Sequence, residues 1–590
     1  MKRNLTYASV FLNSWRPYAW IGLAASLLYI HIVTFLDYTY FDDYILIARN
    51  FSHIDELSDI GHEMFEDAGH QAQGGNLYRP ILTITFILSA QLSGLELWGY
   101  HLVDVLLHAI ACVVVFGTLS TLGFRRSHAF VWSLIFCVHP TLTQAVAWIS
   151  GRNDPLLAIF ILPCFIFFVK FLQAPSLKTY LLHLLFFAGA ILTKETAVAF
   201  PLLAMFYAVG VKKQNLVSRY TLLWLVGWGI VIVNWQVLRY AAQMAQIGDM
   251  WLAIKTILSH SAIAIAFFGK IFWPFDLAFA PVEDDLSIVA GVVGIAVTIV
   301  ALAVSQRRDW GIILFGLAWF GMFQAPTFFH HANLYFPPQF YEHRIYVPFI
   351  GILMVFLSVS LPPHLTPRPM STRAIVLLLL AVLTVLSFRH SFDYRDSITL
   401  REYAARTSPN DVMRYSPINR MHVPEVLAAT IADRTRTRPE GTHNSSQEVS
   451  LSPVDIRSLL REVEEERNRI PKETARRHAL AVLYFARGYL VRSVEEFRAA
   501  IEQDARNPEL RYNLGVLYYD AHFGAKAEQE WLAAIERNPM MADAHHNLCY
   551  WYYEQEQYYK ARDHLNEALQ LGANVAPDLV REIERNLNGR

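Results

Sequence analysis

Two adjacent carboxylates, Asp42 and Asp43, follow the first hydrophobic stretch of the chain, which runs roughly from Trp20 to Leu36. Like charges held close together raise one another's pKa, so such a pair usually serves as a general base, a metal ligand or the partner of a cation. A solvated pair in a polar loop is the simpler alternative, and residue type does not choose between them. If the pair binds a metal, its oxygen ligands favour Mg²⁺ or Mn²⁺.

Further polar side chains recur near the ends of later hydrophobic stretches. Several are cations, which suit an anionic headgroup that leaves as a phosphate. Each also has a structural explanation: a snorkelling anchor, an interhelical hydrogen-bond network or a salt-bridged turn. The candidates for donor or substrate binding are Arg79, His108, His139, Arg152, Lys194, Glu195, Glu342 and Arg344.

The composition predicts an all-α, multi-pass membrane protein. Of 590 residues, 54% are hydrophobic and the mean hydropathy is positive, which is too apolar for a soluble protein of this length. The formal net charge of −1 gives no indication of a nucleic-acid partner. The four cysteines show neither a disulfide framework nor metal-ligand spacing, and no phosphate-binding glycine-rich motif is visible.

About eleven spans are expected. The first follows Met1-Lys2-Arg3 and is interpreted as a retained signal anchor. The others lie near 100–121, 129–148, 155–173, 179–193, 196–210, 220–239, 287–305, 310–327, 344–361 and 374–388. This count places the Lys and Arg clusters of the short loops on the cytoplasmic side, with loop 37–99 and the C-terminal part outside. The stretch 251–280 is interpreted as an amphipathic or re-entrant segment on the outer face.

The composition of the chain changes after Arg389 from apolar to charged. Residues 391–451 read as a linker, and 452–590 as a helical domain. A period of 34 residues relates Tyr484, Tyr518 and Tyr552, with small residues, aromatics and prolines in register. This pattern is typical of tetratricopeptide repeats, of which about three fit within 474–573. Their groove either holds a protein or peptide or only caps the structure.

The order of the motifs resembles the C-type (GT-C) membrane glycosyltransferases. Among these it is similar to the protein O-mannosyltransferase relatives with C-terminal tetratricopeptide repeats, the TMTC-like group. The resemblance is carried by Phe41-Asp42-Asp43, Tyr78-Arg79-Pro80, Gly99-Tyr100-His101 to His108-Ala109, Val138-His139-Pro140 to Ala147, Ser150-Gly151-Arg152, Thr193-Lys194-Glu195-Thr196, Glu342-His343-Arg344 and the repeats. Gln144 stands where relatives often have Glu, which puts an acidic role at that position in doubt.

The resemblance implies transfer of a sugar from a polyprenyl or dolichyl phosphate to a Ser or Thr hydroxyl of a protein, with inversion at the sugar carbon. Asp42 would act as the base and Asp43 would position the acceptor or donor, while Arg79, Arg152, Lys194 and Arg344 would contact the phosphate. The short repeat array favours a bacterial or archaeal homologue. The expected location is the bacterial inner membrane with the repeats in the periplasm, or the endoplasmic reticulum membrane with luminal repeats in a eukaryote.

Two alternatives stay open. One is a GT-C enzyme that glycosylates a lipid or a cell-surface glycan, although helical-repeat grooves usually hold polypeptide. The other is a membrane-anchored scaffold without catalysis, which would need neither Asp42-Asp43 nor so many spans.

Overall fold

The computed structural model describes the chain in several ranges, and Asp42 and Asp43 lie outside them. The described residues are 7–36, 46–47, 54–63, 65, 78–215, 219–242, 260–328, 340–360, 362, 369–395, 397–408, 473–486, 490–520, 523–555, 557–573, 575 and 577–588. Two compact units result, Met1–Arg395 with Thr399–Asp411, and Asp396–Ile398 with Val412–Arg590, and each is described by itself.

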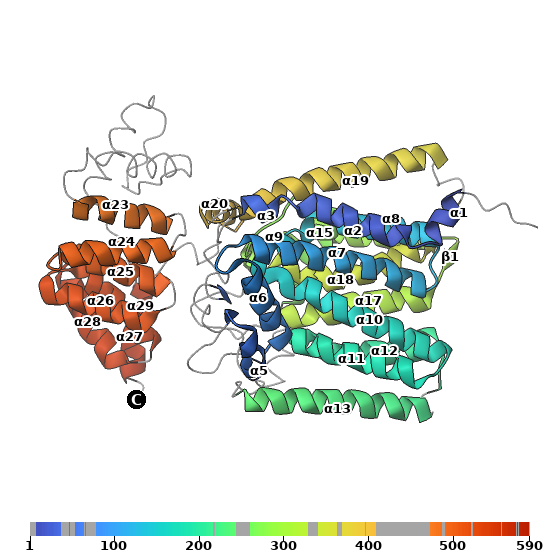
Figure 1. Cartoon of the computed structure of the whole chain (residues 1–590), viewed down its shortest axis with the longest axis horizontal. Coiled ribbons are helices and arrows are strands. Elements are labelled where there is room, and N and C mark those ends of the chain that lie inside the picture. The colour runs from blue at the N-terminus through green and yellow to red at the C-terminus, as the bar shows by residue number, and fades with distance from the viewer. Residues whose placement is uncertain are drawn as a thin grey trace, which may run out of the picture. The chain divides into compact units, whose positions relative to one another are not determined.

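The first unit is a bundle of α-helices (Figure 1). The helices up to residue 407 are α1 (Tyr7–Leu12), α2 (Arg16–Tyr29), α3 (Ile32–Phe35), α5 (Ile60–Glu63), α6 (Pro80–Ser93), α7 (Trp98–Thr121), α8 (Arg126–Cys137), α9 (Gln144–Ala147), α10 (Asn153–Gln173), α11 (Leu177–Thr193), α12 (Phe200–Phe206), α13 (Arg219–Ala241), α15 (Ser261–Phe272), α16 (Val289–Val304), α17 (Trp310–Gln324), α18 (Tyr346–Leu357), α19 (Pro369–Ser391) and α20 (Ser397–Thr407). Short 3-10 helices join them: η2 (Leu57–Asp59), η3 (Pro140–Leu142), η4 (Ile149–Arg152), η5 (Glu195–Ala199), η7 (Glu283–Asp285), η8 (Ala325–Phe328), η9 (Glu342–Ile345) and η10 (Phe392–Tyr394), with the π-helix η6 (Tyr207–Val211). Strands β1 (Arg307–Arg308) and β2 (Val359–Ser360) pair antiparallel, with Arg307 opposite Ser360.

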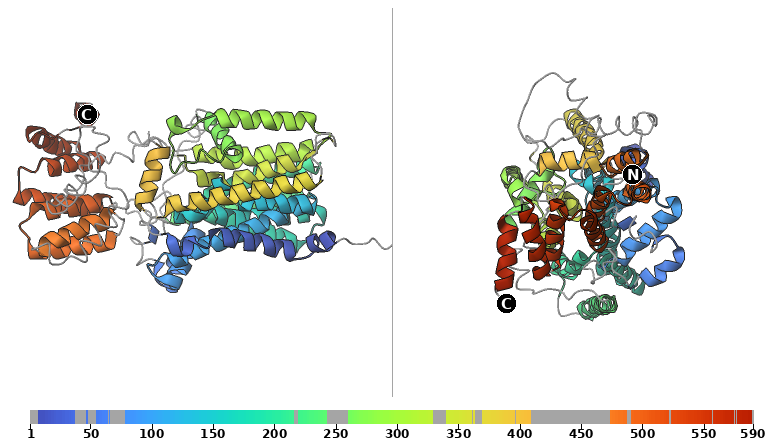
Figure 2. Two further views of the ribbon diagram at one scale, coloured as in Figure 1. Left: turned by 90° about the horizontal axis from the view of Figure 1, so that it is seen from above. Right: turned by 90° about the vertical axis from the view of Figure 1, so that its left-hand side faces the viewer.

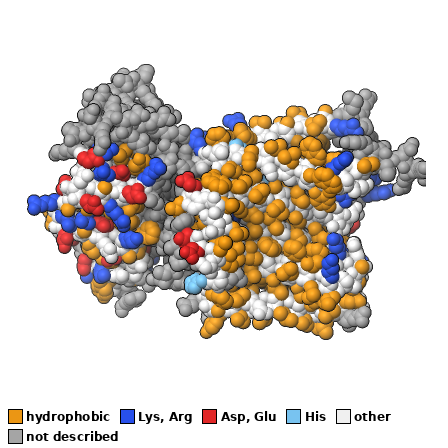
Figure 3. Space-filling view, in the orientation of Figure 1, with side chains coloured by type: hydrophobic (Ala, Val, Ile, Leu, Met, Phe, Trp, Pro, Cys, Tyr) orange, Lys and Arg blue, Asp and Glu red, His pale blue; other side chains and the backbone are white. Residues whose placement is uncertain are grey.

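Hydrophobic side chains cover most of the face of the bundle seen in Figure 3, and Lys and Arg side chains gather at one end of this face. Within the described ranges, five helical segments are long and apolar enough to cross a membrane: Arg16–Phe35, Trp98–Thr121, Ile149–Gln173, Tyr220–Ala241 and Ser371–Tyr394. A bent pair, Arg126–Cys137 with Pro140–Ala147, makes up to six, and six more apolar helices are shorter. The protein is therefore a multi-pass membrane protein, and the count of about eleven spans stays a prediction.

The proline at position 140 breaks its span, as the sequence predicts. α8 ends at Cys137, and the following helical residues 140–147 are bent from it by 57°. Proline cannot donate the helical hydrogen bond, so neighbouring groups must satisfy the freed backbone. Ser387 Oγ donates to the Val138 carbonyl at 2.7 Å, and Thr141 Oγ1 donates to the Lys270 carbonyl at 3.0 Å. The break is thus fixed by two other parts of the chain.

The predicted outer loop 37–99 contains a helix that the sequence analysis did not expect. α6 begins at Pro80, which suits the first turn, and ends at Ser93, with Gly94 as its C-cap in the left-handed region at a φ of 59°. Its residues Leu82 and Phe86 are buried against α7. With 14 residues, α6 is about 21 Å long, which is too short to cross a bilayer upright.

The two ends of segment 260–283 lie close to each other in the bundle. His260 Nε2 lies 3.7 Å from Glu283 Oε2, so the segment that contains α15 ends close to where it starts. α15 also packs tightly on α16, because a Cβ on Gly269 would lie 2.3 Å from the Gly291 nitrogen. Residues 251–259 lie outside the described residues, so the interpretation of 251–280 as an amphipathic or re-entrant segment on the outer face stays a prediction.

The second unit consists of stacked helix pairs. Its helices are α23 (Glu473–Ala486), α24 (Leu490–Gln503), α25 (Pro508–Asp520), α26 (Gly524–Arg537), α27 (Ala542–Glu554), α28 (Tyr558–Gln570) and α29 (Pro577–Asn588). Figure 2 shows the pairs in two further views. Gly524 lets the Trp551 ring approach, since a Cβ there would lie 2.1 Å from a ring carbon. Three pairs correspond to the three repeats predicted within 474–573.

Candidate active site

Breaks between helices bring most of the candidate residues to one end of the bundle. Lys194 follows α11, η9 precedes α18, and Arg79 precedes α6. Asp104 lies near the start of α7, and about 30 Å of helix separates it from Arg125 beyond the other end. The candidates therefore gather at the end of the bundle opposite this predicted cytoplasmic cluster.

Arg152 forms a closed structural network at this end. Its Nε donates to Asp104 Oδ1 at 2.7 Å, and both residues are fully buried. Its other guanidinium nitrogens donate to Thr85, to Ser89 Oγ and to the Tyr100 carbonyl at 2.9–3.3 Å. The side chain thus ties η4 to α6 and α7. In this state it has no nitrogen left over for a phosphate, so its predicted role as a phosphate contact is not favoured by this geometry.

The two candidate histidines also have partners within the bundle. His108 Nδ1 lies 2.7 Å from the Tyr346 hydroxyl, and Nε2 lies 3.0 Å from the Cys137 carbonyl. His139 caps η3 through a hydrogen bond from the Thr141 backbone and lies 3.1 Å from the Ile271 carbonyl. Because the ring nitrogens of both residues are used in this way, their geometry is that of structural residues.

Among the described residues, His108, Cys112 and Cys137 bring their ligand atoms within 4.8 Å of one another. Because its partner is the Cys137 carbonyl, His108 Nε2 must carry the proton and donate it. His108 Nδ1 then accepts a hydrogen bond from the Tyr346 hydroxyl. A metal would have to displace one of these hydrogen bonds, so the cluster fits internal packing better than a metal site.

Lys194 and Asp154 form the centre of the remaining group. Lys194 Nζ donates to Asp154 Oδ1 at 2.7 Å, and both side chains are buried. Asp154 Oδ2 has no hydrogen-bond partner among the described residues, and His343 Nε2 lies 3.8 Å from it. Burial and the neighbouring cations Lys194, Arg344 and Arg79 hold the pKa of His343 well below its usual value, so the ring is neutral near pH 7.

Gln144 fixes the orientation of His343. Its amide nitrogen donates to the Phe279 carbonyl at 2.7 Å, which leaves its Oε1 to accept from the His343 backbone at 2.8 Å. The same oxygen lies 3.3 Å from His343 Nδ1, so Nδ1 carries the proton and Nε2 is an acceptor directed at Asp154. Two acceptors 3.8 Å apart leave a position for a hydroxyl donor. Gln144 therefore has a positioning role that needs no acidic group.

Two further cations border this position. Arg79 donates to Glu195 through two nitrogens, at 2.7 and 3.1 Å. The guanidinium of Arg344 lies 5.2 Å from the centre of the Tyr341 ring, and like Arg79 it interacts electrostatically with Asp154. Among the described residues, these two cations and Lys194 thus lie near two carboxylates, Asp154 and Glu195. Since 40% of the Glu195 side chain is exposed, the Arg79 pair is the more open one.

A third carboxylate, Glu342, precedes His343 in the sequence and forms an ion pair outside this group. Its Oε1 accepts from Lys270 Nζ at 2.5 Å and from the Ala278 backbone at 2.6 Å. Its Oε2 has no hydrogen-bond partner among the described residues and lies 4.0 Å from His390 Nε2. His390 Nδ1 is in turn 2.9 Å from Asp393. Glu342 therefore anchors segment 260–283, which contains α15, and keeps one oxygen without a hydrogen-bond partner among the described residues.

Of the predicted site residues, the structure brings Arg79, Lys194, Glu195 and Arg344 together. It also adds Asp154, His343, Lys270 and His390, which were not among the predicted site residues. Lys270 carried a signal, because a lysine in an apolar segment is expensive unless it is paired. Asp154 carried none, since an acid in the first turn of a helix is ordinary.

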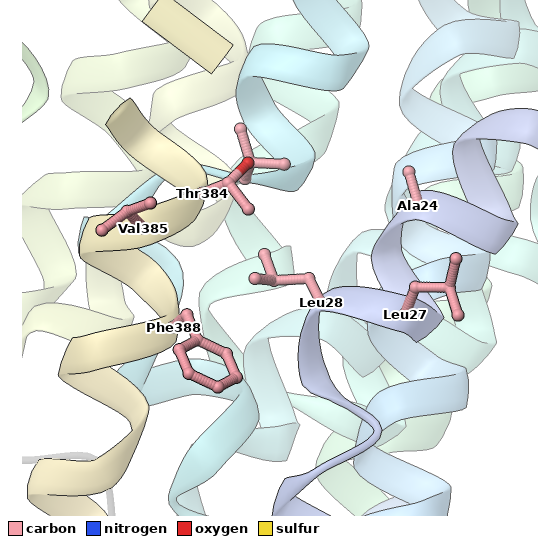
Figure 4. A pocket seen from close by; sticks show the side chains of 7 residues that line it. Ala24, Leu27, Leu28, Thr384, Val385 and Phe388 are labelled. Atoms are coloured by element: carbon pink, nitrogen blue, oxygen red, sulfur yellow. The ribbon is translucent and has the colours of Figure 1, made fainter. Parts of the chain in front are cut away.

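An apolar pocket of about 390 Å³ opens between α2 and α19 (Figure 4). Ala24, Leu27 and Leu28 line it from α2, and Thr384, Val385 and Phe388 from α19, with Val138 also contributing. Beyond this pocket, His31 and Ser391 of the same two segments are hydrogen-bonded at 2.7 Å. The pocket is therefore largely apolar and lies between two helices at the outside of the bundle.

The fold and site define a helical, multi-pass membrane protein with a cationic polar site and a tetratricopeptide array. Residues 80–240 match the family described as dolichyl-phosphate-mannose-protein mannosyltransferase, and residues 482–521 match the TPR repeat. Together with the relatives below, these matches agree with the resemblance seen in the motifs, which is to the TMTC-like group of GT-C proteins with tetratricopeptide repeats.

The curated relatives are similar over short segments. Human Protein O-mannosyl-transferase TMTC1 is 34% identical over 149 residues, 23% of this chain and 16% of the relative. Human Protein O-mannosyl-transferase TMTC3 is 34% identical over 110 residues, 19% and 11% of the two chains. Caenorhabditis elegans Protein O-mannosyl-transferase F38B6.6 is 39% identical over 100 residues, 16% and 14%. The matched segments thus span well under two thirds of these relatives.

Proposed function

We propose that this protein is a glycosyltransferase that moves a sugar, mannose by analogy with its relatives, from a polyprenyl or dolichyl phosphate to a Ser or Thr hydroxyl of a protein. The observation that carries the proposal is the convergence of Arg79, Lys194 and Arg344 around Asp154 at one end of a membrane bundle. Cations held in a partly dehydrated site stabilise the charge that develops on a leaving phosphate. The names of the relatives supply the sugar and the acceptor class.

The apolar pocket between α2 and α19 supports a lipid-linked donor. An isoprenoid chain buries apolar surface there at about 0.8 kcal/mol per methylene, while its phosphate remains in the polar layer. We place the transfer on the non-cytoplasmic face, because the site lies at the bundle end opposite Arg125 and Arg126. We expect the protein in the inner membrane if its source is a bacterium, and in the endoplasmic reticulum membrane if its source is a eukaryote.

In the proposed mechanism, Asp42 removes the proton from the acceptor hydroxyl, whose pKa is far above 7, as the oxygen attacks the sugar carbon. The bond from that carbon to the phosphate oxygen breaks, and the cations hold the phosphate that leaves. A single displacement inverts the configuration at this carbon. Asp43 positions the acceptor or donor, and a divalent ion between the two carboxylates would serve the same electrostatic purpose. The tetratricopeptide groove engages the acceptor or a partner protein.

The test is transfer from a polyprenyl-phosphate mannose donor to a Ser/Thr-rich peptide by the full-length protein in detergent. Asp42→Asn should abolish transfer while the protein accumulates normally, whereas the matched control Asp37→Asn, in the same loop, should remain active. Full activity of Asp42→Asn would overturn the catalytic assignment. Transfer to lipid or glycan acceptors with no peptide product would instead favour a different acceptor class.

A further inference from the structure

Corresponding positions in the first two repeats carry the same ion pair. In the first repeat, Arg477 of α23 contacts Glu496 of α24, with 2.9 Å between guanidinium and carboxylate. Thirty-four residues later, Arg511 of α25 contacts Glu530 of α26, again at 2.9 Å. Each pair therefore joins the first helix of its repeat to the second.

The third repeat replaces this ion pair with two histidines. The next positions in the 34-residue register are His545 on α27 and His564 on α28. Their Nδ1 atoms lie 3.1 Å apart, and the Tyr552 ring stacks on His564 with 5.5 Å between ring centres. The helix-to-helix contact is thus kept, but its charged groups are exchanged for two imidazoles whose nitrogens point at each other.

This spacing is that of two ligands on one metal ion. Zinc binds imidazole nitrogens at about 2.0–2.1 Å, and a tetrahedral angle between two such bonds separates the nitrogens by about 3.3 Å. The unmetallated contact needs a shared proton, which a metal would displace. His545 is 7% exposed, and His564 is half-buried, so an ion would enter from the His564 side.

The surroundings keep both rings available as neutral ligands. Burial lowers the pKa of His545, and burial together with the His545 ring lowers the pKa of His564 to about 4. The charged groups that act on the pair are Glu528 of α26 and Lys560, Asp563 and Glu567 of α28. Three carboxylates against one ammonium give the position a negative potential, which favours a cation.

We infer that His545 and His564 form a binding site for a zinc-class divalent transition metal, with water in the remaining coordination positions. The bound metal holds α27 to α28, as the Arg–Glu pairs do constitutively in the two preceding repeats. The inference is independent of the sugar-transfer proposal, because it concerns only the repeat unit.

The experiment uses the full-length, tag-free protein in detergent after chelator treatment, with hydrogen exchange of the α27 and α28 peptides as the readout. Zinc at ten times its Kd should slow the exchange of these peptides about tenfold. Mg²⁺, which prefers oxygen ligands, should have no effect. The double variant H545R/H564E, which restores the ion pair of the other repeats, should fold and lose the zinc response. His546→Gln, next to the site, should retain it.

The converse variant R511H/E530H should extend zinc-dependent protection to α25 and α26. An unchanged exchange pattern of the wild-type peptides in zinc would overturn the inference. An equal zinc response in H545R/H564E would overturn it as well, because the effect would then come from other residues.

Discussion

The Nζ atom of Lys194 lies 2.7 Å from Oδ1 of Asp154, in a buried pair between residues 40 positions apart. Only one carboxylate oxygen is used, and Nε2 of the neutral His343 ring lies 3.8 Å from the other. An unused buried oxygen costs about 1–3 kcal/mol. Such an arrangement is poor for stability alone, and it suits a ligand hydroxyl that donates its one proton to either acceptor.

Removal of both charges of this pair separates its structural and functional contributions. Lys194→Gln alone removes the cation that is hydrogen-bonded to the buried Asp154 and should destabilise the protein by about 3 kcal/mol, the lower end of the usual range, because Arg79 and Arg344 still act on this carboxylate. The double variant K194Q/D154N should recover most of the thermal stability in detergent, because neither charge remains. Its kcat should still be about 10²–10³-fold below wild type, since a cation at the leaving phosphate is lost. Wild-type kcat in a stable double variant would exclude the pair from the site.

The Arg152–Asp104 pair should resemble the Lys194–Asp154 pair in its effect on stability and differ from it in its effect on activity. Arg152→Ala strands a buried carboxylate and should lower the free energy of unfolding by about 3–5 kcal/mol. The apolar double variant R152M/D104L should restore much of that stability and retain transfer activity. Thermal unfolding and initial rates of both variants check this. A stable but inactive double variant would show that Arg152 contacts substrate after all.

Much of the helical framework follows from local sequence pattern. The expected stretches near 155–173 and 287–305 correspond to α10 and α16, because uninterrupted apolar residues of that length have few alternatives in a membrane. The 34-residue period likewise predicts the helix pairs of the repeats. α6 was missed, since 14 apolar residues inside a polar loop fall short of a span.

The candidate site was only partly predictable, because its contacts join distant residues. The sequence around an arginine does not show whether its hydrogen bonds are all made within the protein. Arg152 is paired with the buried Asp104, whereas Arg79 is paired with the partly exposed Glu195. Similarly, the pairing of Lys270 with Glu342 spans 72 residues and depends on the fold of segment 260–283. Periodicity fixes helices and their faces, whereas such pairings are set by tertiary packing.

The neutral state of His343 predicts a pH dependence of stability. Its pKa in the folded protein is held below the usual value by burial and nearby cations, so between that depressed value and about 6.5 the unfolded chain binds more protons. Protonation of His343 therefore does not affect the free energy of unfolding above pH 6.5, and it lowers this free energy as the pH falls. Thermal unfolding in detergent should show a smaller loss between pH 7 and 5 in His343→Gln than in wild type. Identical pH profiles would contradict a buried, neutral ring.

The apolar pocket between α2 and α19 predicts a dependence on donor chain length. Ala24→Phe should fill part of the pocket and displace about two methylenes of the isoprenoid, which costs about 1.6 kcal/mol. The KM for a long-chain polyprenyl-phosphate donor should then rise about tenfold, and the KM for a short-chain analogue should change little. Leu23→Phe is the matched control, because Leu23 is 47% exposed on the same helix and does not line the pocket. Equal effects of the two variants on both donors would mean that the carrier lipid lies elsewhere on the bundle.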